Sequence, residues 1–182
     1  KNMALEVKAV EEDGTFEGYC AVFGNLDSWN DIIKSGAFKE SLREHKDKGT
    51  MPALLWQHDR KQPIGVYTGM KEDTHGLFVT GRLLKDEVRQ AGEAHALLKA
   101  GALSGMSIGY YARDYSVDEK TWIRTLKKID LVEASLVTFP ANELARVTGV
   151  KAEGIKTIRD FEAALRDVLG FGAKEAKRIA SY

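Results

Sequence analysis

The sequence has very little cysteine and proline, and it lacks long apolar runs. It contains one cysteine and three prolines in 182 residues. A lone cysteine, Cys20, excludes an internal disulfide and cannot by itself form a thiolate metal site. No run of about 18 apolar residues occurs, so no hydrophobic membrane-spanning helix is predicted.

An excess of charge of either sign is also missing. The 27 lysines and arginines balance 27 aspartates and glutamates, which gives a formal net charge of zero. A neutral chain lacks the overall positive field that would attract nucleic acid or an anionic membrane. Because 43 % of the residues are hydrophobic and 30 % are charged, we expect a compact intracellular protein with neither nucleic acid nor membrane as partner.

Short runs of alternating apolar residues dominate the first two thirds of the chain. Leu5, Val7 and Ala9 alternate with polar neighbours, and Asp13-Gly14 predicts a hairpin turn into a strand at 16–23. Further strands are predicted at residues 53–57, 64–70, 77–84, 107–113, 122–129 and 131–139. Seven or eight short strands with turn residues between them predict a barrel or sandwich.

Helical spacing appears at residues 36–48 and 86–100, and again in the tail. From residue 154 onward, apolar residues follow helical spacing to 169, and a second short basic helix is predicted at 173–180. The stretch 147–154 is interpreted as a linker. We therefore expect a β-rich domain at 1–148 and a helical tail at 149–182.

Four histidines are available for chemistry. His45 and His75 lie in polar segments and are expected at the surface, and His95 is explained by packing or exposure on a helix. No pair has the spacing of metal ligands, and no cofactor or metal site is predicted. His58 differs because it ends an apolar strand, where its ring can be held rigidly and stay reachable, as a general base requires. On local pattern alone, an ordinary strand-end histidine with a satisfied hydrogen bond is the better explanation.

A glycine-rich stretch surrounds two candidate nucleophiles, Ser104 and Ser107. Glycines 101, 105 and 109 would let a substrate backbone come close to a serine hydroxyl. Residues 105–109 match the string GxSxG, but the residues that follow alternate like a strand, whereas a nucleophile elbow leads into a helix. On spacing alone, an ordinary glycine-rich turn is the better explanation of the stretch.

The segment 128–142 carries one acidic residue in an apolar strand. Alternation places Glu133 and Ser135 on one face, and both faces are largely apolar. A buried carboxylate without a partner is costly, so Glu133 must pair with another group. That partner is either an arginine or lysine, or a histidine that becomes protonated during a reaction.

Taken in order, these stretches resemble the tailed-phage prohead (capsid maturation) serine proteases, which are related in fold to the herpesvirus assembly proteases. The resemblance covers roughly residues 5–148. The segments that carry it are 16–24 (FEGYCAVFG), 27–33 (DSWNDII), 35–42 (SGAFKESL), 54–59 (LLWQHD), 63–65 (PIG), 76–77 (GL), 106–110 (MSIGY) and 130–142 (DLVEASLVTFPAN).

The resemblance implies a mainly β fold of the α+β class, a compact antiparallel barrel flanked by helices. It also implies a catalytic order of histidine, serine and a third orienting residue. His58 matches the histidine of the family, and Ser107 matches the serine in preference to Ser104. The herpesvirus relatives use a second histidine as the third member, but none follows His95 here. Glu133 is our choice on burial, with Asp130 and Asp59 as alternatives.

The implied function is a serine endopeptidase that cleaves scaffold segments of capsid proteins, and itself, during prohead maturation in the host cytoplasm. Expected partners are the capsid precursor, its scaffold segments and a second copy in a homodimer. The tail is expected either to pack or self-associate, or to act in packaging or as a self-cleavage target. Two other hypotheses remain: a catalytically inactive capsid or scaffold module on the same fold, and a hydrolase of small esters.

Overall fold

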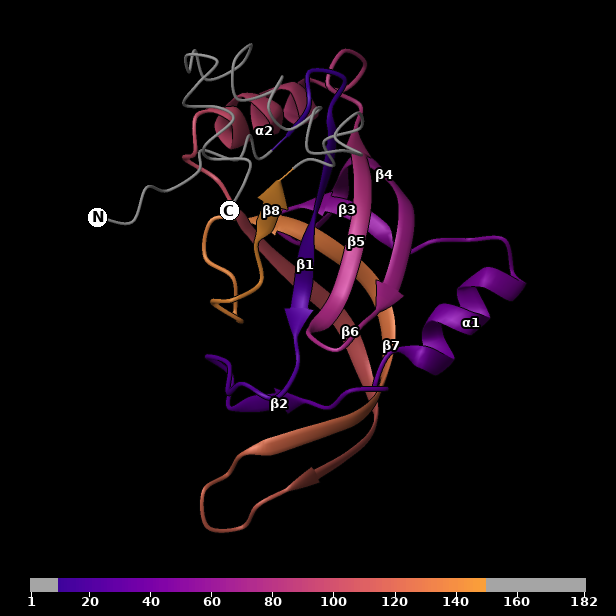
Figure 1. Cartoon of the computed structure of the whole chain (residues 1–182), viewed down its shortest axis with the longest axis vertical. Helices are drawn as coiled ribbons and strands as arrows, with labels where there is room; N and C mark the ends of the chain where they lie inside the picture. The colour runs from indigo at the N-terminus through magenta and orange to yellow at the C-terminus, as the bar shows by residue number, and fades with distance from the viewer. Residues whose placement is uncertain (1–9, 150–182) are drawn as a thin grey trace, which may run out of the picture. The chain divides into compact units, whose positions relative to one another are not determined.

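The computed structural model describes residues 10–149, and this part of the chain forms eight strands and two helices (Figure 1). In chain order the elements are β1 (Thr15–Val22), β2 (Asp31–Ile33), α1 (Lys39–Asp47), β3 (Ala53–Trp56), β4 (Asp59–Glu72), β5 (Gly76–Leu83), α2 (Arg89–Lys99), β6 (Gly105–Val117), β7 (Arg124–Val137) and β8 (Val147–Gly149).

The strands form one strongly curled sheet in the order β2-β7-β3-β4-β5-β1-β8, with β6 paired to β7. The chain passes from β2 through α1 to β3, and both of these strands run parallel to β7. The other ladders are antiparallel. Between β6 and β8 the described residues form only an isolated bridge, Gly105 to Arg146. The sheet is thus a mixed half-barrel, and the expected closed, wholly antiparallel barrel is not confirmed.

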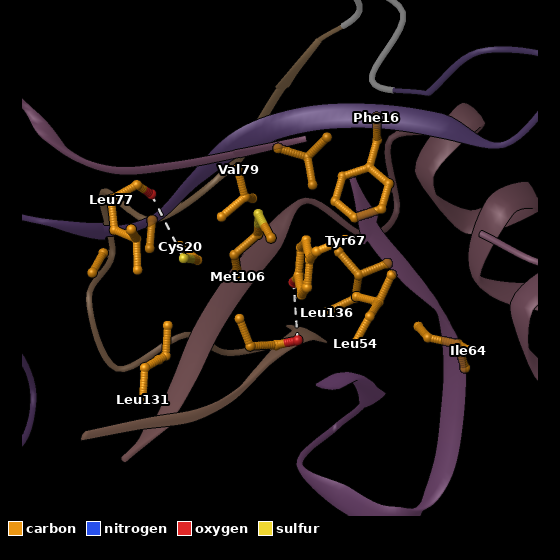
Figure 2. Close-up of a cluster of buried hydrophobic side chains, with 14 of the residues drawn as sticks. Phe16, Cys20, Leu54, Ile64, Tyr67, Leu77, Val79, Met106, Leu131 and Leu136 are labelled. Atoms are coloured by element: carbon orange, nitrogen blue, oxygen red, sulfur yellow. Dashed lines mark hydrogen bonds between the residues drawn. The ribbon is translucent and has the colours of Figure 1, made fainter. Parts of the chain in front are cut away.

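The apolar side chains labelled in Figure 2 come from β1, β3, β4, β5, β6 and β7 and pack together in the core. Phe16 of β1 packs edge-on against Tyr67 of β4, with ring centroids 6.3 Å apart. Gly81 of β5 lies under the Phe16 ring, where an added Cβ would come within 2.7 Å of Cζ. Tyr67 donates its buried hydroxyl to the Ala134 carbonyl of β7 at 2.9 Å. Each large apolar side chain buried here contributes about 1.5–3 kcal/mol of transfer free energy, which holds β7 against the opposite wall.

Most predicted elements are present with shifted ends. The helices predicted at 36–48 and 86–100 correspond to α1 and α2. The strands predicted at 122–129 and 131–139 are wrong as separate elements, because β7 runs through both. Asp130, which lies between the two predicted strands, is part of β7 and pairs with Arg113 of the neighbouring β6 at 3.1 Å.

Two short strands were not predicted. β2 carries no alternating pattern of its own, and β8 occupies the start of the segment interpreted as a linker. The linker interpretation is wrong for Val147–Gly149, because these residues pair with β1. The predicted strand at 5–9 and the tail helices after 154 lie outside the described residues. No helix within residues 10–149 is long and apolar enough to cross a membrane.

Candidate active site

His58 lies at the tip of the hairpin that joins β3 to β4. Trp56 pairs with Asp59, which leaves Gln57 and His58 as a two-residue loop. Both loop residues have positive φ, 51° and 61°. Loops of this kind favour Asn-Gly, and a residue other than glycine held there costs about 1–3 kcal/mol. Neighbouring structure must therefore hold the loop in place.

The end of β7 supplies that support. The Gln57 N–H donates to the Leu136 carbonyl at 3.0 Å, and the Gln57 side-chain amide donates to Thr138 Oγ1 at 2.8 Å. The His58 N–H donates to Ser135 Oγ at 3.1 Å. These contacts fix the backbone of the histidine against the strand that carries Glu133.

Glu133 receives two hydrogen bonds, one at each carboxylate oxygen. His58 Nδ1 lies 2.6 Å from Oε1, and the Ser135 hydroxyl donates to Oε2 at 2.6 Å. Glu133 is only 6 % exposed. Within residues 10–149 its ion-pair partner is His58, and no arginine or lysine pairs with it. With the carboxylate accepting, Nδ1 carries the proton and Nε2 keeps its lone pair free for a substrate or nucleophile.

Gly109 of β6 leaves room for this carboxylate. It pairs directly with Glu133 across the β6–β7 ladder. A Cβ on Gly109 would overlap Glu133 Oε1 and lie 2.9 Å from its Cδ and Cγ. The glycine, which sequence reasoning related to the nearby serines, therefore makes space for the Glu133 carboxylate on the next strand.

Ser107 lies on β6 directly opposite Ser135 of β7. Facing residues of an antiparallel pair have Cβ atoms about 4.5–5.5 Å apart, so Ser135 lies between Ser107 and the backbone of His58. Ser107 is 8 % exposed, and within residues 10–149 its hydroxyl makes no hydrogen bond, including to His58. Nucleophile and base commonly approach more closely only when substrate is bound.

The Ser107 side chain lines a groove of about 550 Å³. Its other walls come from the loop after β1, from β2, from β6 and β7, and from the loop after β7. They include Asp31, Tyr110, Arg124, Ala141 and Asn142. The groove gives a bound molecule access to the serine.

A charged cluster in this groove was missed by sequence reasoning. Asp31 is 2 % exposed and accepts hydrogen bonds from Arg124 Nε at 2.7 Å and from the Tyr110 hydroxyl at 2.8 Å. Burial, followed by the hydrogen bond to Asp31, raises the pKa of Tyr110 well above its ordinary value. These residues are far apart in sequence and meet only because β2 pairs with the start of β7.

The other candidate residues lie elsewhere. Asp59 accepts from Lys61 N–H and Gln62 Nε2 in its own hairpin, and Asp130 pairs with Arg113. Within the described residues, neither carboxylate forms a hydrogen bond or an ion pair with His58. Ser104 precedes β6 and is half-buried, and its carbonyl accepts the Val147 N–H.

Two of the remaining histidines have hydrogen-bond partners in the described structure. His45 was expected at the surface, but its Nε2 lies 3.0 Å from the Leu131 carbonyl and its Nδ1 lies 2.9 Å from Thr50 Oγ1. His95 packs in the core side of α2, with Nε2 2.8 Å from the Glu11 carbonyl. His75 is exposed, as expected.

Cys20 also lines the groove, but it is not a reactive thiol. It is 1 % exposed, and its sulfur lies 3.6 Å from the Leu77 carbonyl (Figure 2). Burial raises the pKa of this thiol well above 9.0. The thiolate form that nucleophilic attack requires is therefore disfavoured.

The sequence is similar to those of two phage proteins. The chain is 39 % identical over 171 residues to the prohead protease of Enterobacteria phage HK97, which covers 91 % of this chain and 73 % of that protein. It is 29 % identical over 158 residues to the capsid polyprotein of Pseudomonas phage PAJU2, covering 81 % of this chain and 22 % of the polyprotein.

The fold has a solved counterpart in the capsid assembly protease of bacteriophage T4. The TM-score is 0.53 at 12 % identity, over 68 % of this chain and 82 % of that structure. A family model described as caudovirus prohead serine protease matches residues 3–161. That match includes both strands that carry Ser107 and Glu133 and the hairpin that carries His58, and the chain belongs to the caudovirus prohead serine protease family.

Proposed function

We propose that this protease is a serine endopeptidase in which Ser107 is the nucleophile, His58 the general base and Glu133 the residue that orients the histidine. The observation that carries the proposal is the 2.6 Å contact between His58 Nδ1 and Glu133 Oε1, close to a serine that lines a groove. A base oriented by a buried acid, with a serine nearby, is the arrangement that acyl transfer requires.

The proposed reaction moves one proton at each step. His58 Nε2 takes the proton of the Ser107 hydroxyl as Oγ attacks the peptide carbonyl. The imidazolium is stabilised by Glu133 and then gives the proton to the leaving amine. Water then attacks the acyl-enzyme and gives a proton to His58 Nε2. His58 returns this proton to Ser107 Oγ as the new carboxyl terminus is released.

The oxyanion of the tetrahedral intermediate needs hydrogen-bond donors near Ser107. Ala141 and Asn142 line the same groove, and their N–H groups make no hydrogen bond within residues 10–149. Pro140 packs on Gly105, two residues before Ser107 on β6. These two amides are therefore the proposed donors.

The shape of the groove favours a peptide over a small ester. Beyond Met106, whose N–H bonds to the Ala145 carbonyl, the outer edge of β6 has no strand partner among the described residues. Ser107, Ile108, Gly109 and Tyr110 follow each other along this edge and line the groove. An extended peptide can add its main chain to such an edge, with its scissile bond at the serine.

The proposed substrates are scaffold segments of the capsid precursor, and the protease itself, inside the assembling prohead in the host cell. Membership of the prohead protease family and the similarity to part of a capsid polyprotein support this substrate class. The same proposal includes a homodimer that forms during assembly. It also includes a tail after residue 148 that packs or self-associates, directs packaging into the prohead or is a self-cleavage target.

The test is incubation of the cognate capsid precursor with the wild-type protein, with Ser107→Ala and with Ser104→Ala, followed by mass mapping of new termini. Cleavage by the wild type and by Ser104→Ala, but not by Ser107→Ala, supports the proposal. Cleavage that survives Ser107→Ala rejects it. An intact precursor in all three reactions, at the protein concentrations of an assembled particle, favours the inactive capsid or scaffold module.

A further inference from the structure

Within residues 10–149, the Ser135 side chain forms hydrogen bonds only with the histidine and the acid of the candidate site. It is completely buried, with 0 % exposure. Its hydroxyl donates to Glu133 Oε2 at 2.6 Å, and the same oxygen accepts the His58 N–H at 3.1 Å. One oxygen atom thus connects the carboxylate to the backbone of the histidine that this carboxylate orients.

We propose that Ser135 is a positioning residue that holds both Glu133 and His58 in register for catalysis. The inference rests on the proposed function. Sequence alternation places Glu133 and Ser135 on one face of the strand but cannot show that they bond to each other. Within residues 10–149 the Ser135 hydroxyl is the donor recorded at Oε2.

The bond to the carboxylate matters because Glu133 is buried. With Oε1 bonded to His58, the second oxygen would face an apolar surrounding without a donor if Ser135 were absent. An unsatisfied buried carboxylate oxygen is costly, so the side chain would rotate or admit water. Either change moves Oε1 away from Nδ1 and frees the imidazole ring.

The bond to the His58 N–H matters because the loop is strained. His58 has φ of 61° and Gln57 has φ of 51°, both unfavourable for side chains with a Cβ. The Ser135 oxygen and the Leu136 carbonyl each accept one N–H of this loop. Removing the Ser135 oxygen leaves the N–H of the histidine without its acceptor.

Ser135 is not itself a second nucleophile. Its proton is directed to Glu133, and its side chain has no access to solvent. Ser107, its partner across the ladder, lines the groove and has an uncommitted hydroxyl. The two serines that pair across the ladder therefore have different roles in the proposal. Ser107 reacts with the substrate, and Ser135 binds His58 and Glu133.

The test compares Ser135→Ala and Ser135→Cys with a matched control, Ser41→Ala, in the full chain. Cysteine keeps the shape of serine but is a weak donor. Ser41 of α1 is also buried, at 1 % exposure, and its oxygen accepts the Leu131 N–H of the same strand. The control thus removes a buried serine oxygen bonded to β7 without touching the site.

Three measurements separate a positioning role from a general effect on stability. Steady-state peptide hydrolysis gives kcat and KM, and thermal unfolding gives the stability of each variant. NMR of the His58 ring in the Ser107→Ala background, which prevents self-cleavage, follows the downfield Nδ1–H resonance expected of an imidazole bonded to a carboxylate. The NMR comparison does not depend on activity.

The inference predicts that both Ser135 variants lose about 10- to 100-fold in kcat while KM changes by less than about twofold. The Nδ1–H resonance broadens or moves upfield in both, and Ser41→Ala keeps the rate and the resonance. Wild-type rates and an unchanged resonance in Ser135→Cys overturn the role of Ser135. If the wild type cleaves no peptide, the result counts against the proposed function and not against the role of Ser135. In that case the Nδ1–H resonance of the Ser135 variants shows whether Ser135 orients His58.

Discussion

Nδ1 of His58 and Oε1 of Glu133 lie 2.6 Å apart, although the two residues are 75 positions apart in the sequence. The contact joins the tip of the β3–β4 hairpin to strand β7. It depends on β3 running parallel to β7, with Leu55 paired to Ser135 and Ala53 to Glu133. The parallel pairing therefore brings the end of one strand beside a buried acid on the next.

The role of Glu133 is tested by Glu133→Gln. Glutamine has nearly the same shape but can present an N–H to Nδ1, which favours the wrong imidazole tautomer. We expect kcat to fall about 1,000- to 10,000-fold with the fold retained, measured by peptide hydrolysis and circular dichroism. Asp130→Asn is the matched control and keeps nearly wild-type kcat. If Asp130→Asn lost more kcat than Glu133→Gln, the orienting role would belong to Asp130.

The space at Gly109 is tested by Gly109→Ala. The added Cβ overlaps the Glu133 carboxylate, so the acid must move and the imidazole loses its support. We expect a fall in kcat of about 100-fold, with a small change in melting temperature. In Gly69→Ala on β4 the new Cβ has its nearest neighbours at 4.0 Å, in Thr80, so this variant should behave like wild type. Equal kcat values for the two variants would contradict this packing.

The groove cluster is tested by Arg124→Ala. This change leaves the Asp31 carboxylate, 2 % exposed, without its guanidinium partner. We expect a loss of about 3–5 kcal/mol in unfolding free energy, measured by urea denaturation. Arg89→Ala breaks an exposed pair with Glu93 and should change stability little. A loss for Arg124→Ala no larger than that for Arg89→Ala would show that Asp31 is solvated.

The buried acidic groups predict a decline of stability at alkaline pH. Burial raises the pKa of Cys20 above 9.0 and of Tyr67 above 10.0. The folded protein keeps these protons while the unfolded chain loses them, so their stabilisation is complete below pH 9 and is lost as pH rises. Unfolding free energy should fall above pH 9 by about 1.4 kcal/mol per pH unit for each ionising group. Cys20→Ala should lessen the slope just above pH 9, and an unchanged slope would indicate an accessible thiol.

The strand pattern and the burial of Glu133 could be predicted from the sequence, because alternation within one strand reveals both. The alternation at residues 131–139 places Glu133 on a buried face and Ser135 beside it. The resemblance to a family supplied His58 and Ser107 as candidates. Their proximity could not be derived from local pattern, since it depends on the register between β3, β6 and β7.

Other features had no local signal. The loop at Gln57 and His58 has positive φ without the Asn-Gly sequence that usually marks it. β2 is three residues long and exists through its parallel pairing with β7. No local pattern shows that one strand, β7, runs through Asp130, because the partner of Asp130 is Arg113 on β6. In each case a tertiary contact overrides the local preference.

The most direct test of the central assignment is active-site labelling with a fluorophosphonate probe, followed by peptide mapping. We expect one covalent adduct, on the Ser107 hydroxyl, which is lost in Ser107→Ala and forms much more slowly in His58→Ala. Ser104→Ala should label at the wild-type rate. An adduct on Ser104 or Ser135, or labelling of Ser107 that does not depend on His58, would contradict the proposed site.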